Sequence, residues 1–117
     1  MTASRIEVAV TDTHSLLWYG GGVMRRLGRD ARKLFERADA GRAAIFVPTI
    51  CLVEIAENAR LGRISLDGSF LAWEGALFGS GHFFPIDLTR DVVRTAEELH
   101  GIPERGDRLI AASAVHL

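Results

Sequence analysis

The sequence predicts an α/β domain built around a small parallel sheet. Short apolar segments typical of buried strands alternate with longer segments whose apolar residues recur at helical spacing. Strands separated by helices indicate parallel pairing, because a parallel connection needs a crossover that a helix can supply. The length of 117 residues, with 48% hydrophobic and 25% charged residues, is that of one ordinary globular domain. We therefore expect a single domain over residues 1–117.

The expected elements follow from local patterns along the chain. Three short apolar strands are expected at residues 6–11, 43–47 and 82–86, with both faces of the sheet covered. The first should be buried and should end at Asp12. Helices are expected at residues 13–19, 23–40, 49–60, 66–78 and 87–100, and from about residue 105 onward.

Composition and charge exclude several classes of protein. Fourteen Lys and Arg residues against fifteen Asp and Glu give a formal charge of −1, which excludes a uniformly basic nucleic-acid coat protein but not a local basic patch. The single cysteine, Cys51, excludes an internal disulfide and fits a buried structural thiol in a reducing compartment. Neither a signal peptide nor a membrane-spanning run is expected, so we predict a cytoplasmic protein without a membrane partner.

Three acidic residues lie where ligands bind in parallel sheets, at the carboxyl ends of the strands. Asp12 follows the first strand, Glu54 lies in the helix after the second strand, and Asp107 lies at the start of the last helix. Carboxylates that converge repel one another unless a cation is present, and hard oxygen ligands favour Mg²⁺ or Mn²⁺. The spacing therefore predicts a metal site formed by these three residues.

Each acidic residue also has a structural interpretation. Asp12 could cap the helix that begins near Thr13, and Asp107 could stabilise the N-terminus of its own helix. Glu54 is harder to explain in this way, because its neighbours Val53 and Ile55 are apolar. The sequence is compatible with the metal site and with these structural roles.

Basic and aromatic residues supply further candidates. Seven basic residues against three acidic ones between positions 25 and 42 could contact RNA phosphates, although the solvated face of an amphipathic helix is the favoured interpretation. The large aromatic residues are expected in the core or at a dimer contact. They are Trp18, Trp73, Phe78, Phe83 and Phe84.

Three segments resemble the motifs of PIN-domain proteins of the VapC toxin type, in the family's order and at similar separations. They are DTHSLLWY at residues 12–19, VPTICLVEIAENARLGRISL at 47–66 and DRLIAASAVHL at 107–117. The resemblance implies a three-layer α/β/α fold and a metal-dependent endoribonuclease, the toxin of a type II toxin–antitoxin pair. It also implies an RNA substrate, a cognate antitoxin protein and a homodimer.

The resemblance carries over to particular residues. It implies that Asp12, Glu54 and Asp107 bind Mg²⁺ or Mn²⁺ and activate water for attack on an RNA phosphodiester. Thr13 would help through its hydroxyl or amide, or would only start the helix. Glu104 keeps a carboxylate at the first acidic position of the family's Asp-Pro-x-Asp segment, without the proline.

Three arginines are candidates for positioning RNA phosphates near the acidic residues. They are Arg60, Arg63 and Arg108. Arg108 could instead pair with Glu104.

One departure from the family concerns the end of the chain. Family members continue into another strand with a fourth acidic residue nearby, whereas this sequence stops at Leu117. We therefore expect the last strand to be missing, which would leave a sheet edge exposed or covered by a partner. The alternative function is a catalytically impaired PIN-like module that binds an antitoxin-like protein or RNA.

Overall fold

In the computed structural model, which describes residues 6–21 and 24–117, strands and helices alternate as the sequence predicts. The elements in chain order are β1 (Glu7–Val10), α1 (Thr13–Gly20), the 3₁₀ helix η1 (Met24–Arg26), α2 (Arg29–Asp39), β2 (Ala43–Pro48), α3 (Thr49–Arg60), α4 (Phe70–Gly79), β3 (Phe83–Ile86), α5 (Arg90–Glu97) and α6 (Arg105–Val115).

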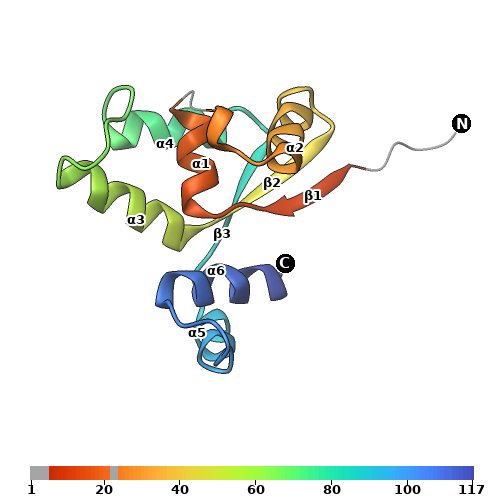
Figure 1. Cartoon of the computed structure of the whole chain (residues 1–117), viewed down its shortest axis with the longest axis vertical. Helices are drawn as coiled ribbons and strands as arrows, with labels where there is room; N and C mark the ends of the chain where they lie inside the picture. The colour runs from red at the N-terminus through yellow and green to blue at the C-terminus, as the bar shows by residue number, and fades with distance from the viewer. Residues whose placement is uncertain (1–5, 22–23) are drawn as a thin grey trace, which may run out of the picture.

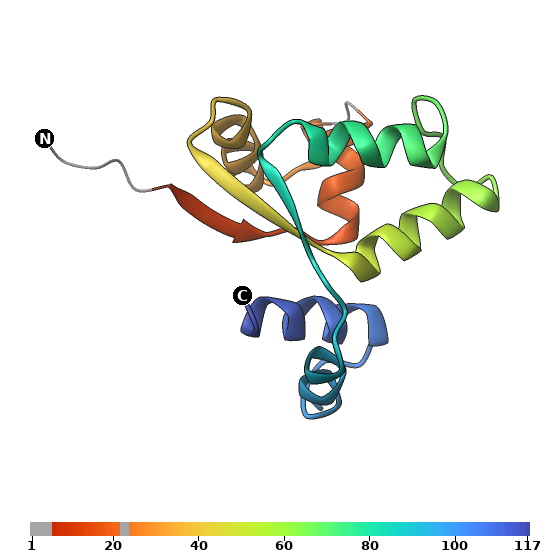
Figure 2. The same cartoon turned by 180° about the vertical axis from the view of Figure 1, so that it is seen from behind.

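The three strands form a parallel sheet in the order β1-β2-β3, which confirms the α/β class and the parallel pairing. In this register Val10 pairs with Phe46, and Phe46 pairs with Phe84. Helices lie on both sides of the sheet, with α1, α2 and α4 on one side and α5 and α6 on the other (Figures 1 and 2). The strands are added in one direction, so both crossover connections fall on the same face.

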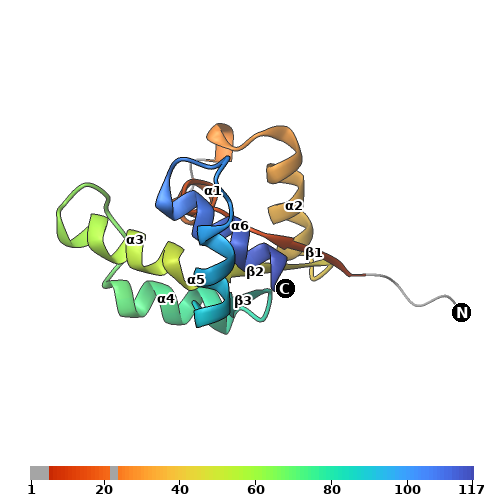
Figure 3. The ribbon, with the colours of Figure 1, turned by 90° about the horizontal axis from the view of Figure 1, so that it is seen from below.

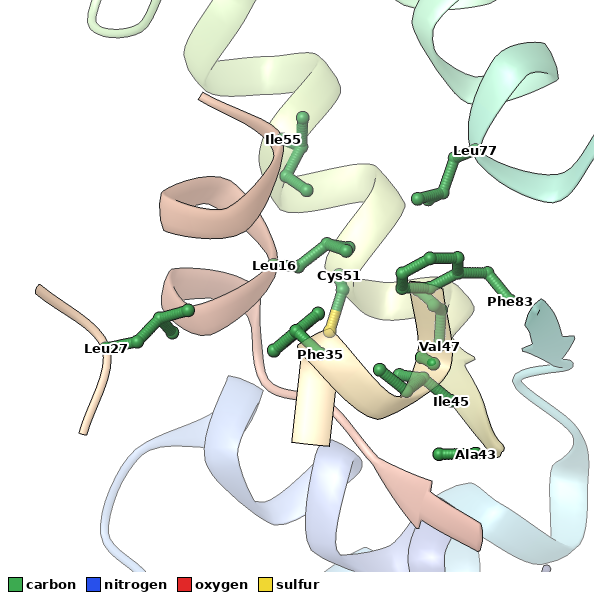
Figure 4. Close-up of a cluster of buried hydrophobic side chains, with 11 residues drawn as sticks. Leu16, Leu27, Phe35, Ala43, Ile45, Val47, Cys51, Ile55, Leu77 and Phe83 are labelled. Carbon is green, nitrogen blue, oxygen red and sulfur yellow. The ribbon is translucent and has the colours of Figure 1, made fainter. Parts of the chain in front are cut away.

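The larger core lies between the sheet and helices α1–α4 (Figure 4). Ile45, Val47 and Phe83 point from the sheet into this core, and Phe35 of α2 stacks on Tyr19 with ring centroids 4.6 Å apart. Several aromatic residues are partly buried against its edge, namely Trp18, Tyr19, Phe70, Trp73 and Phe78.

A smaller core lies on the opposite face, between α5, α6 and the start of α3. Its buried residues are Val92, Ala96, Leu109 and Ala112. Ile50 of α3 packs against this cluster and joins it to the rest of the molecule. Viewed from below, α5 and α6 lie in front of the sheet (Figure 3).

The expectation that the first strand is buried is wrong. Ile6 and Val8 expose 60% and 53% of their surface, because β1 is an edge strand and α6 packs on α5, α3 and β2. Phe84 on β3, at the other edge, is also 39% exposed. The sheet is therefore covered fully on one face and only in part on the other.

Three helices begin later than the sequence pattern predicts, and their N-cap residues explain the later starts. Helix α2 begins at Arg29 rather than at residue 23, which lies outside the described residues, because Gly28 has an extended N-cap conformation. Helix α4 begins at Phe70, after the left-handed Gly68 and the Ser69 hydroxyl that accepts from Ala72 N. Thr89 caps α5 in the same way by accepting from Val92 N.

Candidate functional site

Asp12, Thr13 and Glu54 lie together where β1 and β2 end. Asp12 caps α1, and its Oδ1 accepts a hydrogen bond from Ser15 N at 2.8 Å. The buried Thr13 begins α1, and its hydroxyl donates to Glu54 Oε1 at 3.2 Å. This contact spans 41 positions of sequence and joins the start of α1 to α3.

The placement of Glu54 follows from the way β2 runs into α3. Strand β2 ends at Pro48 and the helix begins at Thr49 without an intervening loop, so the first turns of α3 stay beside the sheet. Ile55 is fully buried and Val53 is 57% exposed, which leaves Glu54 half-buried at the boundary between the two faces. From there its carboxylate reaches the start of α1.

The N-terminus of α6 approaches the same carboxylate. A Cβ atom on Gly106 would lie 3.2 Å from Glu54 Oε1, so a glycine at this position allows the close approach. Asp107, the next residue, is exposed in the first turn of α6. The structure thus brings Asp12, Thr13 and Glu54 together, and it brings Asp107 near them only through its neighbour Gly106.

The pKa of the Cys51 thiol, which lies in the larger core, depends on the charges of this cluster. Its side chain is fully buried, as predicted, and burial is the main cause that raises the pKa of the thiol to about 11. The Glu54 and Asp12 carboxylates also raise this pKa, whereas the polar side chain of Thr13 lowers it. Both carboxylates therefore lie close enough to Cys51 to act on the same buried atom.

A cavity of about 430 Å³ opens beside Glu54, between α3 and the N-terminus of α6. Its charged and polar lining residues are Glu54, Glu57, Asn58, Arg63, Glu104 and Arg105. The structure places the predicted residues Arg63 and Glu104 at this cavity. Sequence reasoning missed Arg105, Asn58 and Gly106, of which only Gly106 carried a signal, as a glycine within the first turn of a helix.

The other two candidate arginines do not lie at this cavity. Arg60 is exposed and lines a separate hollow beside Ile64 and Phe70. The guanidinium of Arg108 donates to the carbonyl oxygens of Ile102 and Pro103 at 3.0 and 2.7 Å. Arg108 thus holds the loop before α6 instead of pairing with Glu104, because two orphan carbonyls lie within its reach.

The basic stretch between residues 25 and 42 forms an exposed helical face. Arg32 lies 3.5 Å from Glu36, and Arg37 donates to Glu7 at 2.7 Å, which ties α2 to β1. Arg29 and Lys33 are exposed on the same helix. This arrangement matches the solvated face of an amphipathic helix, the interpretation that the sequence favoured.

The donor chemistry of the acidic cluster suits a hard divalent cation. Asp12, Glu54 and Asp107 offer only carboxylate oxygens, which are the ligands that Mg²⁺ and Mn²⁺ prefer. One oxygen of Asp12 and one of Glu54 are used in the bonds to Ser15 and Thr13. Within residues 6–21 and 24–117, no three His, Cys, Asp or Glu side chains are placed to hold an ion together.

No family model, curated protein or solved structure matches this chain. In the part of the chain that the structure describes, no helix combines the length and apolar character needed to cross a bilayer.

Proposed function

We propose that this chain is a PIN-like, metal-dependent endoribonuclease that resembles the VapC toxins of type II toxin–antitoxin pairs. The observation that carries the proposal is the hydrogen bond between Thr13 and Glu54, which holds Glu54 beside Asp12 at the carboxyl ends of the strands. Parallel sheets bind their ligands at this edge. Two of the three motifs that carry the resemblance therefore meet in space.

The proposed roles follow from the chemistry of the side chains. Asp12, Glu54 and Asp107 would hold Mg²⁺ or Mn²⁺, which supplies an activated water and stabilises charge on the leaving oxygen. Arg63 and Arg105 line the cavity that contains Glu54 and can bind a phosphate in a bidentate manner. Glu104, which lines the same cavity, would add negative charge beside the metal.

Thr13 is proposed as a positioning residue. Its hydroxyl bonds Glu54 Oε1 and limits the directions in which the carboxylate can point. It also begins α1, so the structural role and the supporting role are combined in one residue.

The biological setting of the proposal comes from the family resemblance. A cytoplasmic toxin of this kind would cleave RNA, form a homodimer and be inhibited by a cognate antitoxin. Arg60 and Arg108, which lie away from the cavity beside Glu54, are the weakest of the proposed phosphate contacts.

RNA cleavage in Mg²⁺ or Mn²⁺ tests the proposal with two matched variants. Asp12→Asn keeps a good N-cap residue, and Glu54→Gln keeps an acceptor for Thr13, so both remove charge with little effect on folding. We expect each to reduce cleavage by about 100-fold or more, since even outer-shell partners of metal sites cost roughly 10- to 100-fold.

Glu97→Gln is the control for this experiment, because it removes an exposed carboxylate from α5. Its cleavage rate should equal that of the parent chain. Cleavage that survives Asp12→Asn unchanged would show that the acidic cluster is not the active site.

A second candidate function is a binding module without catalysis. It is favoured by the structural use of the two carboxylates, because Asp12 caps α1 and Glu54 accepts from Thr13. A parent chain that binds RNA or an antitoxin-like protein but cleaves no RNA with either metal would establish this function in place of the nuclease.

A further inference from the structure

A second and larger cavity, of about 870 Å³, lies beside the candidate active site. It is formed by α1, the end of α3, the loop after α3 and the start of α4. Its lining includes His14 and Trp18 from α1, Asn58 from α3 and Trp73 from α4. This cavity is distinct from the one that contains Glu54, but Asn58 lines both.

Three side chains with planar rings line this cavity, namely His14, Trp18 and Trp73. The ring centroids of His14 and Trp18 are 5.9 Å apart, and both rings border the cavity. Trp73 borders it from α4, and its indole nitrogen lies 3.2 Å from the place where a Cβ on Gly20 would stand. Gly20 therefore allows the indole to lie close against α1. Both tryptophans of the chain contribute to the same cavity.

Polar side chains also line this cavity. Asn58, Ser65 and Asp67 line the cavity and can donate to or accept from a ligand with several polar edges. A pocket with aromatic walls and a few polar groups is suited to a planar heterocycle, because such a ligand stacks with its faces and forms hydrogen bonds with its edges.

Two elements connect this pocket to the acidic cluster. Thr13 of α1 bonds Glu54, and the next residue, His14, borders the aromatic cavity. On α3, Asn58 lies one turn after Glu54, a rise of about 6 Å, and its Nδ2 donates to the Glu54 carbonyl at 2.8 Å. Because Asn58 lines both cavities, a phosphate beside Glu54 and a ring in the aromatic cavity would belong to neighbouring parts of one ligand.

We infer that this cavity is a nucleobase subsite, which holds an unpaired base of the RNA next to the phosphate at the acidic cluster. The inference rests on the proposed ribonuclease function, because it assigns the second cavity to the same substrate. His14, Trp18 and Trp73 supply the stacking surfaces, and Asn58, Ser65 and Asp67 bind the edge of the base. The subsite selects single-stranded RNA, since a base within a duplex cannot enter it.

Tryptophan emission tests the subsite directly, because the only two tryptophans line it. The parent chain is titrated, in a chelator that removes divalent ions, with a short single-stranded RNA and with an abasic oligomer of the same length. We expect the RNA to quench the emission to saturation, and the abasic oligomer to leave it unchanged. The abasic oligomer should bind roughly 5- to 150-fold more weakly, because it lacks the stacking free energy of one base on an aromatic side chain.

Variants separate the subsite from general binding of the backbone. Trp73→Leu keeps an apolar side chain against the core but removes the ring, and should weaken RNA binding about tenfold. His14→Ala alters an exposed residue and should weaken binding a few-fold without affecting the fold. Phe84→Leu, which removes a partly exposed ring from the sheet, is the matched control and should bind like the parent.

The outcomes distinguish this inference from the nuclease proposal. If Glu54→Gln abolishes cleavage but RNA and abasic oligomer bind the parent equally with unchanged emission, the nuclease stands and the base subsite is overturned. If nucleoside monophosphates quench the emission while no RNA is cleaved, the subsite stands and the nuclease falls. Absence of RNA and nucleotide binding both in the chelator and in Mg²⁺ or Mn²⁺, together with absence of cleavage, overturns both.

Discussion

The two layers of helices differ in how firmly they are held to the sheet. Helices α1–α4 share one continuous core with β2 and β3, which includes fully buried Phe35 and Ile45. Helices α5 and α6 share a core of four buried residues and join the rest mainly through α3 and β2. The first layer is thus a packed framework, whereas the second is a helix pair attached to it.

The candidate active site lies across the boundary between these layers. Asp12 and Glu54 belong to the framework and are joined by the Thr13 bond, whereas Asp107 belongs to the helix pair. Gly106 provides the close contact between them. The position of the third carboxylate therefore depends on the weaker of the two cores, and mutations in the two layers should have different consequences.

The largest effect is expected from Phe35→Ala in the framework. Phe35 is buried and stacks on Tyr19, so its removal leaves a cavity and should lower the free energy of unfolding by about 3–5 kcal/mol. Denaturant unfolding followed by circular dichroism measures this loss. A loss below about 1 kcal/mol would show that the larger core does not dominate stability.

Leu109→Ala in the helix pair should cost less, about 2–3 kcal/mol, because Leu109 lies in the smaller core and retains some exposure. The same substitution should reduce RNA cleavage under conditions where the protein stays folded, since it loosens the helix that carries Asp107. Comparing cleavage with the far-ultraviolet circular dichroism signal at the same temperature checks this. A variant with full activity would show that α6 does not need this core to place Asp107.

Alkaline pH should destabilise the framework in particular. Burial raises the pKa of Cys51 from 9.0 to about 11, and burial followed by the hydrogen bond to Asp39 raises that of Tyr19 from 10.0 to about 12. Both groups are neutral when protonated, so the unfolded chain loses these protons first and the stability present below pH 9 declines from there to about pH 12. The slope is on the order of 1 kcal/mol per pH unit for the buried Cys51 and is smaller for the half-exposed Tyr19, where solvent screens the charge.

Denaturant midpoints measured across this range test the alkaline prediction. Tyr19→Phe keeps the ring on Phe35 and removes the phenol, so its stability should fall less steeply above pH 10. Glu54→Gln should lower the pKa of the Cys51 thiol, because it removes a charge that raises it. An unchanged profile in both variants would contradict the assigned causes.

The smallest change in stability is expected from Gly106→Ala, at the contact between the layers. Alanine favours the helix by about 0.5–1 kcal/mol, but its Cβ would press on Glu54 Oε1 at 3.2 Å. The carboxylate end of Glu54 can shift, so the net stability should change by less than about 1 kcal/mol while cleavage falls. Equal cleavage by the parent and the variant would show that the position of Glu54 tolerates displacement.

Much of the fold could be predicted from the sequence because the signals are local. The apolar run at residues 43–47 and the start of α3 at Thr49 agree with β2 and α3 in the structure. The helix starts at Arg29 and Phe70 differ from the predicted ones because the N-cap residues Gly28 and Ser69 begin each helix after the apolar pattern has begun. The exposure of β1 could not be predicted, because a strand at the edge of a sheet can have the same apolar sequence pattern as a strand at its centre.

The candidate site shows the same division. The sequence by itself determined the α/β class and the order and chemistry of Asp12, Glu54 and Asp107, because hydrophobic period and residue type are local properties. Only the tertiary structure decided that Thr13 bonds Glu54, that Gly106 lies against this carboxylate and that Asn58 lines two cavities. These relations join residues far apart in the chain, and they depend on how α1, α3 and α6 pack around the sheet.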